Sequence, residues 1–104
     1  MNRQLDLQAI SRSFERVALN NNWQALHTPQ NLASAISVEA AELLRLFQWS
    51  GTRDGQAVPT ANAVAEELAD LVMYINALAD VLDIDLVDAV AEKCSHNEVR
   101  FLNE

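Results

Sequence analysis

Apolar residues recur at steps of three and four along most of the chain, and this spacing constrains the fold more than any other feature of the sequence. The clearest series are Leu7, Ile10, Phe14, Val17 and, later, Val64, Leu68, Leu71, Ile75, Leu78, Leu82. Such steps bring side chains to one face of a helix, whereas a strand requires a period of two, which no useful length of the chain follows. The pattern therefore predicts an all-α fold without a sheet.

Four helices are predicted, over residues 3–20, 30–49, 61–82 and 85–101. The loop SGTRDGQAVPT, before the third helix, holds both glycines and one of the two prolines, residues that commonly interrupt helices. Asp85, with Asp88 three residues later, resembles a capping box that opens the fourth helix. Short connections favour antiparallel neighbours, so we expect an up-and-down four-helix bundle. A length of 104 residues suits a single domain, residues 1–104.

The charge balance excludes some classes of partner. The chain carries 7 Lys and Arg against 15 Asp and Glu, a formal net charge of −8. Binding to a phosphate backbone relies on clustered Lys and Arg, so we expect no nucleic-acid partner and favour cation binding instead. Cys94 is the single cysteine, which excludes an intrachain disulfide and favours a reducing compartment. Because no run resembles a signal peptide or a membrane span, the expectation is a cytoplasmic protein without a membrane partner.

Several carboxylates fall on or beside apolar helix faces. At about 100° per residue, Glu39 lies inside the apolar stripe of the second predicted helix and Glu42 lies on its edge. In the third predicted helix, Glu67 borders the stripe and Asp70 lies beyond it, while Glu66 faces solvent. Two carboxylate pairs with the same i, i+3 spacing therefore flank the core-facing sides of neighbouring helices.

These pairs predict a metal site. Burying an unpaired carboxylate costs several kcal/mol, and four together also repel one another unless a cation lies between them. A hard divalent cation suits an all-oxygen site, and Mg²⁺ is the usual ion where a phosphate substrate completes the coordination. A single Glu-x-x-Glu pair is more often a solvated face, and two pairs on neighbouring helices weaken that interpretation. A di-iron site is disfavoured, since neither His27 nor His96 stands three residues after a glutamate.

Four short motifs follow one another between Trp23 and Arg100. The first, His-x-Pro-x-Asn-Leu, begins at His27, and the second, Glu-x-x-Glu before Leu-Phe-Gln-Trp, ends at Trp49. The third, Glu-Glu-Leu-x-Asp-x-x-x-Tyr, ends at Tyr74, and the fourth is Lys-x-x-x-Asn-x-x-Arg. In this order and spacing they resemble the MazG-like, all-α nucleoside triphosphate pyrophosphohydrolases, and within them the dCTP pyrophosphatase branch.

The resemblance implies Mg-dependent hydrolysis of a (deoxy)nucleoside triphosphate, such as dCTP or a related or modified dNTP, to the monophosphate and pyrophosphate, a house-cleaning reaction of the nucleotide pool. Mg²⁺, or Mn²⁺ in its place, would be held by four carboxylates that also carry the catalysis: Glu39, Glu42, Glu67 and Asp70. Which of them acts as the base stays open. The implied substrate-binding residues are Trp23, His27, Asn31, Trp49, Tyr74, Lys93, Asn97 and Arg100.

The resemblance assigns the predicted substrate-binding residues to different parts of the nucleotide, and for three of them a purely structural role is an alternative. Lys93 and Arg100 would meet the triphosphate, and Asn97 would bond sugar or phosphate. The base would stack near Trp23 and Trp49, with His27 and Asn31 reading its edge. Ordinary core packing explains Trp49 and Tyr74 about as well, and a loop position explains His27 nearly as well.

The sequence departs from the family pattern at two places. Leu26 replaces the aromatic residue that often precedes the histidine, and Phe101 and Leu102 replace a terminal Tyr-Pro. Both changes bear on base selection and on how the last helix closes over the site.

Some apolar and small residues lie outside the main stripes of the predicted helices, and they bear on assembly. Apolar and small residues outside the main stripes are Ala41, Ala65, Ala69, Met73 and Ala77. A helix that is apolar on more than one side is usually covered on more than one side. With the family resemblance, this predicts a homo-oligomer, a tetramer rather than a dimer, in which Trp23 or the N-terminal helix serves a neighbour's site. The alternative to the enzymatic function is a non-catalytic helical module that senses nucleotides or binds another protein.

Overall fold

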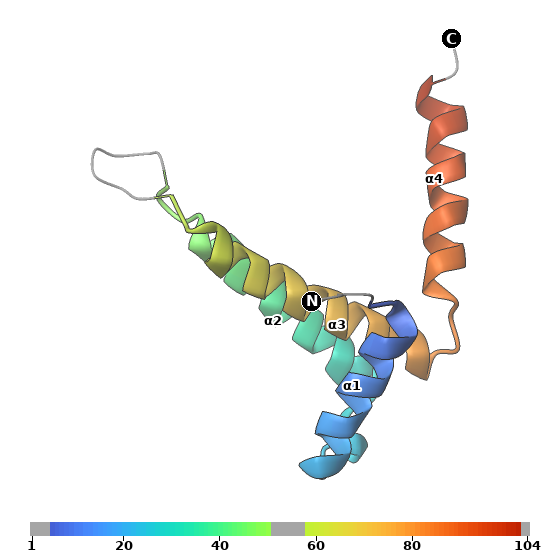
Figure 1. Ribbon diagram of the computed structural model, residues 1–104. Helices are drawn as coiled ribbons and strands as arrows, with labels where there is room; N and C mark the ends of the chain where they lie inside the picture. The colour runs from blue at the N-terminus through green and yellow to red at the C-terminus, as the bar shows by residue number, and fades with distance from the viewer. Residues whose placement is uncertain (1–4, 51–57, 103–104) are drawn as a thin grey trace.

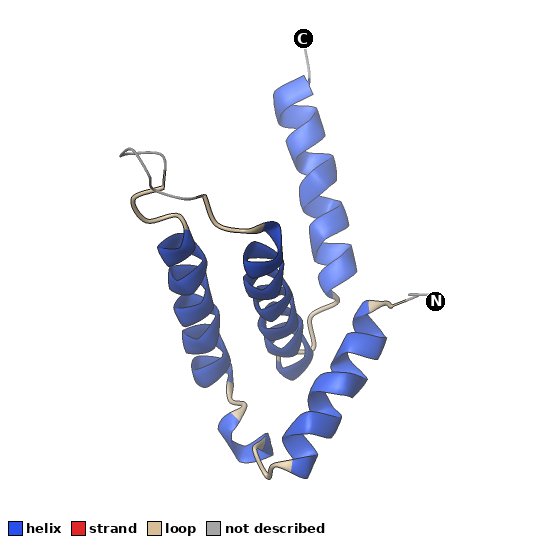
Figure 2. Cartoon of the chain, turned by 60° about the vertical axis from the view of Figure 1, so that its left-hand side comes forward, coloured by secondary structure: helices blue, strands red, loops and turns tan. Residues whose placement is uncertain are grey.

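The computed structural model describes residues 5–50 and 58–102, which are helical apart from their connections. The elements are α1 (Leu7–Asn20), a short 3-10 helix η1 (Gln24–Leu26), α2 (Pro29–Leu46), α3 (Ala61–Val81) and α4 (Leu86–Leu102). Figure 1 and Figure 2 show this arrangement from two sides. The prediction of four helices without a sheet is confirmed for the described residues, which exclude the first part of the range 3–20 and most of the Gly-containing loop.

Each helix begins where a side chain caps its first turn. Asp6 accepts a hydrogen bond of 2.8 Å from the amide of Ala9, so α1 begins at Leu7 rather than at residue 3. The predicted cap at Asp85 is confirmed, since its carboxylate accepts a 3.0 Å bond from the amide of Asp88. The second helix ends at Leu46, three residues before the predicted end. Beyond it, Trp49 has a φ of 69°, a left-handed conformation that cannot continue a helix.

The helices α2 and α3 pack side by side, and α1 packs across the second half of α3 (Figure 1, Figure 2). The buried core among the described residues is small. It consists of Leu32, only 1% exposed, with Ala18, Ala77 and Ala79, and one polar residue, Asn76. No residue of the predicted apolar stripe of α3 is fully buried, and Leu68 stays 48% exposed.

The predicted up-and-down bundle does not close within one chain, because α4 leaves the other helices (Figure 1). Leu86 is half-buried and all the other described residues of α4 are exposed, including Val90 and Cys94 of its apolar stripe. The turn into α4 passes through Asp83, whose φ of 54° redirects the chain. Helical spacing tells which face of a helix is apolar, and it does not tell which surface covers that face.

One chain by itself is open for its size. Its accessible surface is 8485 Å², against roughly 5,800 Å² expected for a monomeric protein of this mass. Its radius of gyration is 17.1 Å, against about 13 Å for a compact domain of this length. No helix within the described part of the chain combines the length and apolar character needed to cross a membrane.

Candidate functional site

Three of the four predicted carboxylates meet where α2 and α3 lie side by side. Glu39 comes from α2, and Glu67 and Asp70 come from successive turns of α3. Each offers one oxygen, and the three oxygens lie within 4.8 Å of one another. All three residues are half-buried, so the group faces the seam between the helices rather than open solvent.

The carboxylates of the cluster repel one another, and the described residues around them do not provide hydrogen bonds for all of their buried oxygens. A hydrogen bond with Glu67, then burial, then the negative charges of Glu42, Glu67 and Asp70 raise the pKa of Glu39 to about 7. Even so, one oxygen of Glu39 and one of Glu67 are buried without a hydrogen-bond partner among the described residues. Buried acceptors of this kind are rare unless a ligand satisfies them. An all-oxygen group with two unsatisfied acceptors fits a hard divalent cation such as Mg²⁺.

Two other glutamates lie at the margin of this cluster. Glu42 is exposed and is not one of the three residues that converge, although its charge helps raise the pKa of Glu39. Glu66 is also exposed, whereas the adjacent Glu67 is half-buried. For this adjacent pair, the directions predicted from the sequence agree with the structure. Elsewhere on α3 they agree less well, because Ala77, predicted outside the apolar stripe, is buried and Leu68, within the stripe, is 48% exposed.

The raised pKa of Glu39 predicts a pH-dependent stability of the metal-free protein. Between the ordinary pKa of 4.5 and about 7, the folded protein keeps a proton that the unfolded chain releases. This contribution to stability is present below pH 4.5 and is lost as the pH rises through about 7. We expect the melting temperature of the protein in EDTA to fall across this range more steeply than that of Glu39→Gln. If the melting temperatures of the two proteins fell equally with pH, the raised pKa of Glu39 would be contradicted.

An aromatic pocket lies beside the carboxylates. It has a volume of about 160 Å³, and its lining includes the rings of Phe14, Trp23, His27 and Tyr74 together with Asp70. The ring centroid of Phe14 lies 4.8 Å from that of His27 and 5.8 Å from that of Tyr74, the latter in an edge-on arrangement. Because Asp70 belongs to both the pocket and the cluster, a flat ring in the pocket would lie next to a cation at the carboxylates.

The MazG-like family model matches residues 34–102, which are about two thirds of the chain and include most of α2 and all of α3 and α4. The chain belongs to the MazG-like family. The matched segment contains all four predicted metal carboxylates. It leaves out α1, which contributes Phe14 to the aromatic pocket, and Trp23, which precedes η1.

Two curated relatives are similar to this MazG-like chain over most of its length. The dCTP pyrophosphatase 1 of Mus musculus is 39% identical over 99 residues, and that of Homo sapiens is 36% identical over 101 residues. Each alignment covers 91% of this chain and 58% of the relative. The chain thus spans a little over half the length of these relatives.

A solved structure is similar over nearly the whole chain. A pyrophosphatase from Archaeoglobus fulgidus DSM 4304 superposes with a TM-score of 0.79 and is 32% identical in sequence. The match covers 97% of this chain and 96% of the archaeal chain. The position of α4 away from α1–α3 is therefore compatible with the arrangement of a related protein.

Two of the predicted base-binding residues, Asn31 and Trp49, are not among the residues that line the aromatic pocket. The Asn31 side chain donates a 2.8 Å hydrogen bond to the carbonyl of Leu26, so this amide group shapes the turn before α2. Trp49 follows the far end of α2, a helix of 18 residues and about 27 Å, while Trp23 and His27 precede its start. Within one chain, Trp49 and Trp23 therefore cannot stack on the same base.

The predicted triphosphate-binding residues are likewise not brought to the cluster by their own chain. Lys93, Asn97 and Arg100 are exposed on α4, and α4 stands away from α2 and α3 (Figure 1). The guanidinium of Arg100 lies 5.0 Å from the ring centroid of Phe101, a local contact within α4.

Sequence reasoning missed four residues that line the pocket, which are Phe14, Val17, Ala18 and Met73. Phe14 was assigned to the core stripe of the first helix, and Met73 was placed opposite the core face of the third. The stripe was a correct signal for an inward-facing ring. It could not show that the ring would meet His27, which comes from a different part of the chain.

Proposed function

We propose that this chain hydrolyses a (deoxy)nucleoside triphosphate, dCTP or a related or modified dNTP, between the α and β phosphates, releasing the monophosphate and pyrophosphate. The observation that carries the proposal is the pocket of aromatic rings that shares Asp70 with a cluster of unsatisfied carboxylates. A nucleotide has the matching pair of features, a flat base and a chain of phosphates that binds through a divalent cation. The similarity to two dCTP pyrophosphatases and to an archaeal pyrophosphatase supports the same reaction.

The roles of the residues follow from their positions. Glu39, Glu67 and Asp70 would hold Mg²⁺, or Mn²⁺ in its place, with Glu42 at the edge of the group. When bound, the ion neutralises phosphoryl charge and favours in-line attack by water. A carboxylate oxygen left uncoordinated accepts a hydrogen bond from that water and orients it. The rings of Phe14, His27 and Tyr74 offer faces and edges against which a base can pack.

Pyrophosphate release tests the proposal directly. The purified protein is incubated with Mg²⁺ and each of a panel of dNTPs and NTPs, and pyrophosphate and monophosphate are measured. We expect release from dCTP or a related nucleotide and a strong loss in Glu39→Gln. Nucleotide binding without turnover by the wild-type protein, or equal turnover by both proteins, would favour the non-catalytic module instead.

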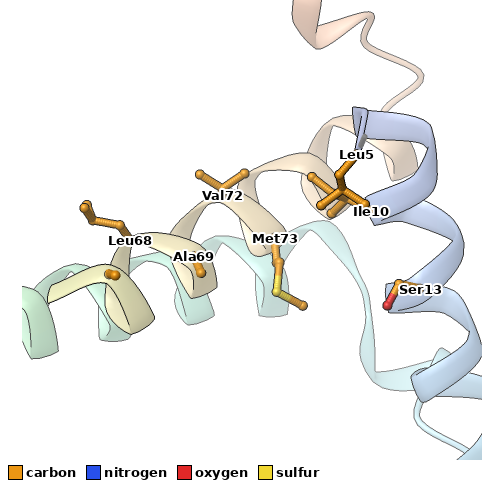
Figure 3. A pocket seen from close by; sticks show the side chains of 8 residues that line it. Leu5, Ile10, Ser13, Leu68, Ala69, Val72 and Met73 are labelled. Carbon is orange, nitrogen blue, oxygen red and sulfur yellow. The ribbon is translucent and has the colours of Figure 1, made fainter. Parts of the chain in front are cut away.

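The chain is also proposed to act as a homo-oligomer, a tetramer rather than a dimer. An apolar groove of about 540 Å³ runs between α1 and the first half of α3 (Figure 3). Its α3 wall includes Leu68, Ala69 and Val72. The opposite wall includes Ile10 of α1 and Leu5, which precedes α1. One chain exposes about 2,700 Å² more surface than a compact monomer would, which exceeds the area that a standard interface buries. A second copy would cover such a groove and would bring its own α4 or Trp49 toward the site.

Light scattering with paired variants tests the assembly. We expect a mass that is a multiple of 11.5 kDa for the wild-type protein. Val72→Glu places a charge in the groove and should lower the mass, because an unpaired charge in an interface is costly. Val99→Glu, on the side of α4 away from its apolar stripe, is the matched control and should keep the wild-type mass. Full activity at 11.5 kDa would rule out both the oligomer and a shared site.

A further inference from the structure

One buried polar residue has no part in the proposed chemistry. Asn76 is 3% exposed and lies in the last third of α3, next to the buried alanines of the core. Its side-chain amide donates to the carbonyl of Leu7 at 3.0 Å and to the hydroxyl of Ser11 at 2.9 Å, both on α1. The Ser11 hydroxyl donates in turn to a carboxylate oxygen of Asp80, one turn further along α3, at 2.5 Å. Asn76, Ser11 and Asp80, which we call the α1–α3 clamp, therefore join the two helices by polar contacts.

Every donor of the clamp has an acceptor within reach. Both amide hydrogens of Asn76 have acceptors on α1. The single hydroxyl hydrogen of Ser11 has two acceptors within hydrogen-bond distance, the Asp80 carboxylate on α3 and, at 3.0 Å, the Leu7 carbonyl on α1, and the shorter contact is the one to Asp80. Hydrogen bonds require a particular distance and direction, whereas apolar contact tolerates sliding and rotation. Only one residue of α1, Ala18, is buried. The rotation of α1 on α3 is therefore specified more by the clamp than by apolar packing.

The clamp lies one turn from the aromatic pocket. Ser11 and Phe14 are three residues apart on α1 and share a face, so an orientation that satisfies Ser11 also aims Phe14. Phe14 then meets Tyr74, which precedes Asn76 on α3 by two residues, and His27, which precedes α2. Without the clamp, α1 could rotate or slide and carry Phe14 away from both rings.

We propose that Asn76 is a positioning residue which, through Ser11 and Asp80, holds Phe14 as a wall of the aromatic pocket and thereby sets how tightly the planar ring of a ligand binds there. The inference rests on the proposed function for the nature of the ligand. The positioning of Phe14 itself does not depend on any reaction, and it can be measured separately.

A proton NMR experiment tests the positioning without a substrate. The chain has two histidines, and the Phe14 ring lies close to only one of them, His27, whose ring protons therefore sense its ring current. In Asn76→Leu, which keeps the branched shape and the number of heavy atoms and removes the donors, we expect the His27 signals to move toward their positions in Phe14→Leu. The signals of His96, exposed on α4, should stay fixed, and a His96→Gln variant assigns the two sets. Unchanged His27 signals in a folded Asn76→Leu protein would overturn the proposal.

Steady-state kinetics test the consequence for binding. We expect Asn76→Leu to raise KM for the preferred nucleotide roughly fivefold, the factor that corresponds to one lost hydrogen bond, with kcat nearly unchanged. Asn62→Leu makes the same substitution at an exposed position of α3 and should behave as wild type. If Asn76 acts through Phe14, adding Phe14→Leu to Asn76→Leu should raise KM no further than Phe14→Leu alone. Additive effects, or a fall in kcat with KM unchanged, would contradict positioning.

A second variant keeps the test decisive if Asn76→Leu does not fold. Ser11→Ala removes the link to Asp80 while leaving Asn76 its bond to Leu7, and the same shift of the His27 signals and a smaller rise in KM are expected. If the wild-type protein releases pyrophosphate from no nucleotide, the proposed function fails, while the NMR comparison still decides whether the clamp positions Phe14.

Discussion

Glu67→Gln should lower kcat about a hundredfold or more, whereas Glu66→Gln, one residue earlier, should leave it close to the wild-type value. The two residues have the same side chain, and they differ in the direction in which that side chain points from α3. Glu67 is half-buried and shares a hydrogen bond with Glu39, and Glu66 is exposed. Replacing Glu67 by its neutral isostere removes a charged metal ligand while keeping the shape of the side chain, and losses of this size are typical of such a change. The measurement is the initial rate of pyrophosphate release at saturating nucleotide and Mg²⁺.

The pair contains its own control for folding. Both variants should be folded, which far-UV circular dichroism and melting curves will establish. Removing one carboxylate from a mutually repelling cluster should leave the metal-free Glu67→Gln protein at least as stable as the wild type. A large loss in Glu66→Gln together with full activity in Glu67→Gln would mean that the assigned phase of α3 is wrong by one residue.

The number and the ends of the helices were largely predictable because their signals are local. A side chain that caps a helix lies within three residues of the amide it bonds, as Asp85 does with Asp88. Trp49 shows where this reasoning fails. The sequence pattern predicts that the second helix continues to Trp49. In the structure α2 has already ended at Leu46, and the backbone of Trp49 is left-handed. The sequence there is compatible with a helix, and propensity is a weak guide when the chain must turn.

The carboxylate cluster was partly predictable for a geometric reason. Glu39 and Glu67 are aimed inward by the helical period alone, and any packing of α2 against α3 along these faces brings them together. The same logic could not decide between Glu42 and Asp70. Glu42 lies at the edge of its stripe and Asp70 lies beyond its own, yet the structure includes Asp70 in the cluster and leaves Glu42 exposed.

The partners of α1 and α4 were not predictable, because both helices depend on contacts distant in sequence. The amphipathic stripe of α4 is present, with Leu86 and Val90, but its own chain does not cover it. Asn76 lies 65 residues from Ser11 along the chain, and no spacing rule links them. A buried asparagine within an apolar helix is a cue that a polar partner exists, although the partner's position comes only from the fold.

Removing divalent metal ions should abolish turnover, and adding Mg²⁺ or Mn²⁺ should restore it. Three carboxylates with oxygens within 4.8 Å repel one another, and two of their buried oxygens have no hydrogen-bond partner in the described parts of the chain, so without a cation the cluster lacks its counter-charge. A bound cation would also stabilise the folded state by linkage. We therefore expect EDTA to eliminate pyrophosphate release and to lower the melting temperature at neutral pH. Full activity in EDTA would contradict the metal role of Glu39, Glu67 and Asp70.

Calcium separates binding from catalysis at the same carboxylates. Ca²⁺ accepts more ligands at longer distances and in looser geometry than Mg²⁺, so it should occupy the cluster and raise the melting temperature without restoring comparable turnover. In Glu39→Gln the added ions should raise the melting temperature much less, because one charged ligand is gone. If instead both ions stabilise Glu39→Gln as much as the wild-type protein, they bind elsewhere. The effect of EDTA on turnover would then have to arise from metal bound to the nucleotide alone.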